Sequence, residues 1–173
     1  MPTDDFDAIC NTVNLYPVAV DTLTWSLFDR CFTEDCLVDF GGPAVFEGLE
    51  NLKAIFEVIH RPFKATQHFT SNHQVAVSGD SATCITYVRG VFVREMPEGG
   101  NMFESTGWYD DVLLRTADGW RISKRLCRMS WWGGNGDVIR TSPEAGPPEE
   151  TDALSAEAAA GRLAHLNALL GEG

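Results

Sequence analysis

Histidine and carboxylate side chains are the groups in this sequence best suited to acid–base chemistry. The chain has 173 residues, of which four are histidines and 25 are aspartates or glutamates. Histidine titrates near neutral pH, and a carboxylate bound to one ring nitrogen fixes its tautomer so that the other nitrogen can take a proton. His68 is one candidate for such a base. From the residues alone, a structural histidine that caps the sheet is the favoured interpretation of His68.

Motifs for other chemistries are missing from the sequence. No carboxylate stands at metal-ligand spacing from a histidine. The cysteines form no C-x-x-C pair, which argues against a zinc or redox motif. There is no glycine-rich phosphate loop after a strand and no serine nucleophile elbow. We therefore expect neither a metal nor a cofactor. The five cysteines are Cys10, Cys31, Cys36, Cys84 and Cys127.

The charge and the N-terminus narrow the range of partners. The formal net charge is −12, which would repel a phosphate backbone, so nucleic acid is not an expected partner. The acidic start, Met1 to Asp5, does not resemble a signal peptide, and no apolar run reaches the ~18 residues that span a membrane. We therefore expect a cytoplasmic protein with reduced thiols and no membrane partner.

Apolar residues at helical spacing predict three helices in the first 60 residues. The first covers Phe6 to Val20, with a kink or break at Pro17, because proline lacks the backbone donor and crowds the preceding turn. The second covers Thr22 to Phe32, and Asp21 or Thr22 is a natural N-cap for it. The third covers Leu49 to Ile59.

From residue 65 the pattern changes to that of strands. A short strand over 37–40 precedes four longer strands, joined by short glycine-containing turns, which predicts an antiparallel meander. Both strand faces carry apolar residues, so one face can pack on the helices and the other on a partner subunit. The predicted fold class is therefore α+β. We also expect the protein to be a homo-oligomer. The longer strands begin near Ala65, Ala82, Met102 and Trp120.

The composition shifts after residue 135. Gly133 to Gly136 and the proline-rich stretch 141–150 indicate a linker. The alanine-rich segment from Thr151 to Leu170 predicts an amphipathic helix that docks on the body of the protein or on a neighbour. We therefore expect one domain over 1–135, followed by a linker and tail helix over 136–173.

Three segments resemble the SnoaL-like, nuclear-transport-factor-two-like superfamily. They are AVDTLTWSLFDRCFTEDCLVDFGG (19–42), ATQHFTSNHQVAVSGDSATCITYVRG (65–90) and GWYDDVLLRTADGWRISKRLCRMSWWGGN (107–135). The resemblance covers roughly residues 6–135. It implies a cone-shaped, curved antiparallel sheet with three helices in the N-terminal half (a cystatin-like roll) that cups a pocket, and it implies a dimer.

Within that superfamily, the chain looks like the scytalone-dehydratase-like branch. Members of this branch carry an aspartate at the end of the first helix and a histidine at the start of the strand after the third helix, and Asp21 and His68 fall at these positions. Tyr16 matches a tyrosine that some members carry five residues before the aspartate. The resemblance implies that His68 is the base, that Asp21 orients it, and that Tyr16 donates a hydrogen bond to a developing oxygen. Tyr16 could instead be a core aromatic.

Other positions depart from the branch. Its second pocket histidine aligns with Phe92, a pocket tyrosine with Phe40, and a serine and an asparagine with positions near Gly107 and Tyr109. The Asp–His pair is kept and the substrate-holding groups are not, so the identity of a substrate does not carry over.

Strand alternation suggests further pocket residues. Asn72 shares the face of His68, whereas His73 should lie on the opposite face. One of Asp110 and Asp111 must point inward unless a bulge intervenes, which makes it a further candidate acid. It could instead pair with Arg121 or Arg125 on the neighbouring strand. The candidate substrate-binding residues are Trp25, Phe40, Asn72, Trp108, Asp110, Met129 and Trp131.

The sequence therefore predicts a cofactor-independent lyase, such as a dehydratase, or an isomerase. Its substrate would be a small hydrophobic, cyclic molecule, and the reaction would begin with proton abstraction by His68 and Asp21. A polyketide-type cyclase is an alternative, because members of one fold share a pocket and differ in chemistry. A non-catalytic ligand-binding or dimerisation domain is another, favoured by the lost polar positions.

Overall fold

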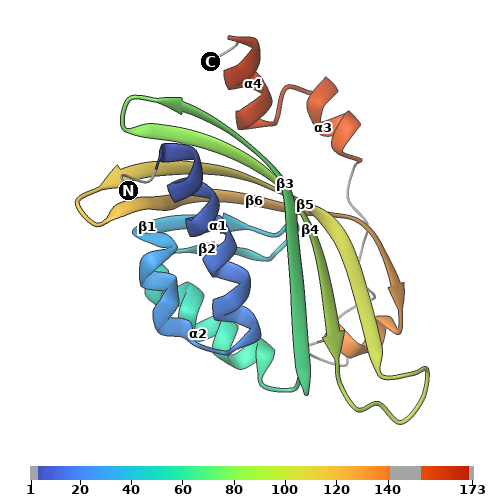
Figure 1. Ribbon diagram of the computed structural model, residues 1–173. Helices are drawn as coiled ribbons and strands as arrows, with labels where there is room; N and C mark the ends of the chain where they lie inside the picture. Colours follow the sequence, from blue (N-terminus) through green and yellow to red (C-terminus); the bar gives the residue numbers. More distant parts are fainter. Residues whose placement is uncertain (1–3, 141–152, 172–173) are drawn as a thin grey trace.

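The computed structural model describes residues 4–140 and 153–171 (Figure 1). It has an α+β fold in which helices cover one face of a curved sheet. The helical elements are α1 (Asp5–Asp21), η1 (Trp25–Arg30), α2 (Leu49–His60), η2 (Gly136–Ile139), α3 (Leu154–Ala159) and α4 (Ala164–Leu170). The strands are β1 (Phe32–Asp39), β2 (Val45–Glu47), β3 (Ala65–Ser78), β4 (Ser81–Val93), β5 (Met102–Thr116) and β6 (Gly119–Gly134).

The sheet has the strand order β2-β1-β6-β5-β4-β3. The predicted meander of four long antiparallel strands is confirmed by β3 to β6. The sheet as a whole is mixed rather than antiparallel, because β1 pairs with β6 in parallel. The sequence pattern placed β1 over 37–40, and the structure starts it at Phe32, directly after η1.

Helices α1 and α2 lie on the inner face of the sheet (Figure 1). Their apolar side chains and those of the sheet form the main core. Residues of α1 one turn apart, including Ile9, Val13 and Val20, are fully or almost fully buried. Thr12 also ties α1 to β6, because its hydroxyl donates to the carbonyl of Trp120 at 3.1 Å. This packing fixes the position of α1 relative to the sheet.

The predicted break at Pro17 does not occur. Helix α1 continues through Pro17, which is buried, and ends at Asp21. Packing of α1 on β3 and β6 outweighs the loss of one backbone hydrogen bond.

The predicted second helix is largely absent, and Asp21 is not its N-cap. Leu23 has a left-handed backbone (φ 55°), and the amide of Thr24 returns to the carbonyl of Ala19 at 2.9 Å. This tight turn ends α1, and only a six-residue 3-10 helix (η1) follows, without a side-chain cap. The carboxylate of Asp21 is therefore free to bond across to the sheet.

A bulge in β3 reverses the predicted faces of two residues. The register against β4 shifts between Ser71 and Gln74, and Asn72 has a left-handed backbone with φ 54°. His73 then approaches the inner face, where its Nδ1 lies 2.9 Å from the hydroxyl of the buried Thr86. The alternation assumed for a regular strand was therefore wrong for Asn72 and His73.

The tail forms two short helices, α3 and α4, rather than one. Gly161, with φ 67°, interrupts it. Helix α4 contacts β3, β4 and β5, so the predicted docking on the body is confirmed. Asp110 of β5 holds α4 there by accepting hydrogen bonds from the amides of Ala164 and His165. The proline-rich stretch 141–150 lies outside the described residues, and the boundary at 135/136 stays a prediction.

None of the described helices is long and apolar enough to cross a membrane.

Candidate active site

Asp21 and His68 form a hydrogen-bonded pair on the inner face of the sheet. Asp21 is the last residue of α1, and His68 lies near the start of β3. His68 Nδ1 lies 2.7 Å from Asp21 Oδ1, and the backbone amide of His68 donates to Oδ2 at 2.8 Å. The hydroxyl of Thr66 adds a third bond to the carboxylate at 2.9 Å. Because a carboxylate only accepts, Nδ1 carries the proton and Nε2 keeps a free lone pair.

The electrostatics keep Asp21 ionised. Burial alone raises the pKa of Asp21, but the bonds from His68 and Thr66 outweigh burial, so that its pKa is lowered. An ionised Asp21 stabilises a positive charge on His68 once the imidazole has taken a proton.

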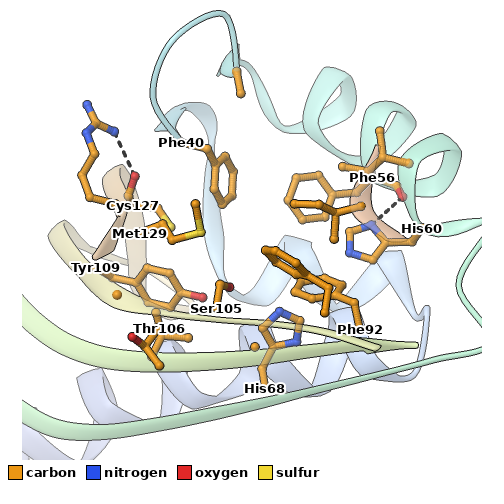
Figure 2. A pocket seen from close by; sticks show the side chains of 18 of the residues that line it. Phe40, Phe56, His60, His68, Phe92, Ser105, Thr106, Tyr109, Cys127 and Met129 are labelled. Carbon is orange, nitrogen blue, oxygen red and sulfur yellow. Dashed lines mark hydrogen bonds between the residues drawn. The ribbon is translucent and has the colours of Figure 1, made fainter. Parts of the chain in front are cut away.

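A cavity of about 340 Å³ lies beside His68, between α2, the segment 40–46 that follows β1, and the inner face of the sheet (Figure 2). This volume is within the range of small-molecule sites. Most of its wall is apolar, and the polar side chains at its surface are few. Its lining includes Tyr16, Phe40, Phe56, His60, His68, Phe92, Phe103, Ser105, Thr106, Tyr109, Cys127, Arg128 and Met129.

Gly90 of β4 keeps the space beside His68 open. A Cβ atom at Gly90 would lie 3.0 Å from Phe92 Cε2 and 3.2 Å from His68 Nε2. Figure 2 shows His68 and Phe92 side by side at the cavity, and their rings meet edge to face with centroids 5.3 Å apart. His68 Nε2 makes no hydrogen bond to any residue in the described part of the chain, so a ligand can reach it.

Two tyrosines place hydroxyl groups at the cavity. Tyr16 of α1 and Tyr109 of β5 are each 3% exposed and line it, and Figure 2 shows the Tyr109 hydroxyl directed inward. Burial raises the pKa of both tyrosines, so they remain protonated hydrogen-bond donors at neutral pH. Arg125 lies against both rings, with its guanidinium carbon 4.5 Å and 4.1 Å from their centroids.

The positive charges near the cavity are compensated by carboxylates. Arg125 forms a bidentate pair with Asp111, at 2.8 and 2.7 Å. Arg128, which lines the cavity, donates to both carboxylate oxygens of Asp39 at 2.9 Å. The cavity therefore offers hydrogen-bonding groups within apolar walls and no uncompensated charge among its described lining residues.

His60 is a second cavity histidine that the sequence analysis missed. It ends α2 and is 5% exposed, and its Nδ1 lies 2.9 Å from the carbonyl of Phe56, one turn earlier. Burial lowers the pKa of His60 to about 4, against the opposing effect of this bond, so the ring is neutral at pH 7. No motif marks His60, because its position depends on where α2 ends above β3 and β4.

The structure places only some of the predicted substrate-binding residues at the cavity. Phe40 and Met129 line it, and so does Phe92. Trp25 instead packs behind it, with its ring 5.4 Å from that of His60. Asn72 is exposed at the β3 bulge.

Three other predicted residues lie on the outer face of the sheet. Trp108 and Trp131 border a separate hollow there, with Phe69 and Tyr87. Asp110 caps α4. Of the two adjacent aspartates, Asp111 points inward and pairs with Arg125, as one of the predicted alternatives had it.

The fold and this cavity agree with the SnoaL-like domain that the sequence resembles. The sequence profile of the SnoaL-like domain family matches residues 2–126, and the chain belongs to this family. The protein Rv2910c of Mycobacterium tuberculosis is 30% identical over 114 residues, which cover 64% of this chain and 76% of that protein.

Solved structures agree with this assignment. The Kfla4162 protein from Kribbella flavida is 27% identical, with a TM-score of 0.71 over 75% of this chain and 93% of the other. The hexachlorocyclohexane dehydrochlorinase LinA-type3 from Novosphingobium barchaimii is 20% identical, with a TM-score of 0.65 over 79% and 93% of the two chains. At that identity, the likeness to the dehydrochlorinase shows the fold alone.

Proposed function

We propose that the chain is a cofactor-independent lyase or isomerase that acts on a small hydrophobic, cyclic molecule in the cavity beside His68. The observation that carries the proposal is the bond of 2.7 Å between Asp21 and His68 Nδ1, which leaves Nε2 free at the cavity. The dehydrochlorinase of the same fold is in keeping with an elimination.

In this mechanism His68 Nε2 removes a proton from a carbon next to a carbonyl or a leaving group. Asp21 stabilises the resulting imidazolium. In a β-hydroxy ketone, the electrons of the broken C–H bond form the new C=C bond, and the hydroxide leaves as water with the proton that His68 returns. In a cyclic halide, the halide leaves as an anion and the proton stays on His68 until solvent takes it. Return of the proton to another carbon would give an isomer.

The tyrosines would stabilise negative charge that develops on a carbonyl oxygen. Tyr16 and Tyr109 both line the cavity, and Figure 2 shows the Tyr109 hydroxyl directed into it. Donors held in place in an apolar cavity stabilise an oxyanion more than water does. Arg125 beneath both rings strengthens this donation, because its charge opposes the rise in the pKa of Tyr16 and of Tyr109.

Proton exchange tests the base without knowledge of the natural substrate. Cyclic ketones such as 2-tetralone would be incubated with the protein in D₂O, and the loss of α-protons followed by NMR. The wild type should exceed the buffer rate, and His68→Ala should fall to it. His73→Ala is the matched control, since His73 lies on the same strand outside the cavity lining and should keep the wild-type rate.

A screen of cyclic hydroxy ketones and cyclic halides follows, with enone absorbance and halide release as readouts. If neither exchange nor turnover exceeds buffer for any ligand that binds, the enzyme proposal is wrong.

The alternative is a ligand-binding protein that does no chemistry. The specific observation in its favour is that Phe92 and Phe40 occupy positions where the related branch has polar groups, which leaves the cavity mostly apolar. Binding of cyclic ketones with unchanged exchange in wild type and His68→Ala would support it. A polyketide-type cyclase would instead show exchange together with ring closure of a linear polyketone.

We also propose that the protein is a homo-oligomer that associates through the outer face of the sheet. Phe69, Tyr87 and Trp131 of that face are each 44–50% exposed and border one hollow. Exposed apolar patches of this kind mark interaction surfaces. Gel filtration with light scattering at micromolar concentration should give a multimer, and Trp131→Glu should shift it toward the monomer. A wild-type monomer would contradict this proposal.

A further inference from the structure

The second cavity histidine has hydrogen-bonding capacity that nothing in the protein uses. The carbonyl of Phe56 can only accept, so the bond of 2.9 Å requires the proton on His60 Nδ1 and leaves a lone pair on Nε2. No residue in the described parts of the chain donates to that nitrogen. His60 nevertheless lines the cavity and is 5% exposed. The nitrogen keeps accessible surface at the cavity, so solvent or a ligand donor can bond to it there, and an apolar ligand group that displaces the solvent would leave it without a partner.

The ring of His60 is held in one orientation. It stacks on Phe56 with centroids 5.1 Å apart, meets Phe63 edge-on at 5.7 Å, and contacts Trp25 at 5.4 Å. Trp25, Phe56 and Phe63 thus surround the ring, and Figure 2 shows it beside Phe92 at the end of the cavity away from Tyr109. An acceptor fixed in this way distinguishes ligands by the position of their donor.

We propose that His60 is a specificity-determining residue that accepts a hydrogen bond from a hydroxyl group of the ligand. The cavity would then select uncharged ring compounds with a hydroxyl group, such as phenols and cyclic alcohols. This inference rests on the proposed function only in that the same cavity holds the ligand, and it needs no turnover.

The charges around the cavity should also favour neutral ligands over anions. A carboxylate would face the lone pairs of His60 and His68, and Arg128 is already bonded to Asp39. The low pKa of His60, about 4, means that the ring does not supply a positive charge at pH 7. An anion of the same shape should therefore bind more weakly than the neutral hydroxyl compound.

Isothermal titration at pH 7 with 2-naphthol, 2-methoxynaphthalene and 2-naphthoate tests the inference. On the wild type, 2-naphthol should bind at least about fivefold more tightly than the methyl ether, because the ether offers no donor to His60 Nε2 and displaces the solvent that would otherwise bond to it. 2-Naphthoate should bind most weakly. Equal affinity for 2-naphthol and its ether on the wild type would overturn the inference without any variant.

Variants then assign the preference to His60. His60→Phe keeps a ring of similar size and should bring 2-naphthol and its ether within about twofold, with the ether affected little. His73→Phe, the control outside the cavity lining, should keep the wild-type preference. If His60→Phe fails to fold, His60→Gln retains an acceptor, and it should keep the preference while His60→Leu loses it.

His68→Ala separates this inference from the proposed function. If the preference for 2-naphthol disappears in His68→Ala and persists in His60→Phe, the acceptor is His68 and the inference is wrong. Conversely, a preference that depends on His60 while no ketone undergoes exchange would leave the inference standing and remove the proposed catalysis.

Discussion

Two carboxylate pairs lie on the same face of the sheet and differ in what they leave available. Asp111 and Arg125 are both 0% exposed, and both carboxylate oxygens of Asp111 bond to the guanidinium. Asp21 and His68 are 21% and 9% exposed, and His68 Nε2 is left without a partner among the described residues. In the first pair both carboxylate oxygens are used within the core, where Arg125 Nη1 is buried and has no partner among the described residues; the second pair presents an acceptor to the cavity.

Burial and unused hydrogen-bonding capacity distinguish the structural pair from the candidate catalytic pair more clearly than residue type does. Removing half of a fully buried ion pair leaves an uncompensated charge, so its value lies in stability. Removing the carboxylate of a partly exposed pair changes the tautomer and basicity of the histidine that remains. Such a pair therefore contributes mainly to acid–base chemistry. Each expectation can be measured independently of the other.

Asp111→Asn should produce the largest effect on stability. It leaves Arg125 charged, buried and without its carboxylate, which costs about 3–5 kcal/mol of the free energy of unfolding. Urea unfolding followed by tryptophan fluorescence measures this loss. The double variant Asp111→Leu, Arg125→Met removes both charges and should recover most of it. A loss below about 1 kcal/mol in Asp111→Asn would contradict the structural role.

Asp21→Asn should give the opposite pattern. The amide no longer offers two negative oxygens to His68 and Thr66, so His68 loses its fixed tautomer. Proton exchange or turnover should fall at least about a hundredfold, whereas the free energy of unfolding should fall by only about 1 kcal/mol. Loss of several kcal/mol of stability with an unchanged exchange rate would instead place Asp21 with the structural pair.

Gly90→Ala tests the open space on which the comparison depends. The new methyl group would press on Phe92 and His68 at 3.0–3.2 Å, which should cost about 1–3 kcal/mol of stability and weaken 2-naphthol binding severalfold. The matched control is Gly133→Ala, whose Cβ would meet only the carboxylate of Glu104 at 3.9 Å. Thermal unfolding and titration of both variants measure the difference, and equal effects would refute a special role for Gly90.

Much of the fold could be predicted from the sequence because its signals are local. The long strands β3 to β6 show β-branched and aromatic residues between glycine turns, and α2 shows a clear apolar stripe. The failures arose where tertiary contacts decide. The parallel pairing of β1 with β6, the survival of α1 through Pro17, and the turn at Leu23 that shortens the second helix depend on packing between distant segments.

The site could be predicted in part for the same reason. Asp21, His68 and Tyr16 follow from motif positions, and the structure brings all three to the cavity region. His60 and Tyr109 carry no motif, and their role depends on where α2 ends and which way β5 faces. Asn72 was misplaced because one bulge residue with positive φ reverses the alternation of a strand. Asparagine adopts that conformation more readily than most residues, but the residue type alone does not indicate which asparagine adopts it.

The two pairs should also differ in how stability depends on pH, although this is the smallest of the expected effects. The folded pKa of Asp21 is below its ordinary value of 3.8, so its contribution to stability is present above that value and is lost as the pH falls through the folded pKa. The free-energy difference between wild type and Asp21→Asn is therefore followed below about pH 5. It should shrink by on the order of 1 kcal/mol as the solution is acidified below about pH 4. Urea unfolding of both proteins across this range checks the sign, and a difference that grows on acidification would mean that Asp21 is not held ionised by His68 and Thr66.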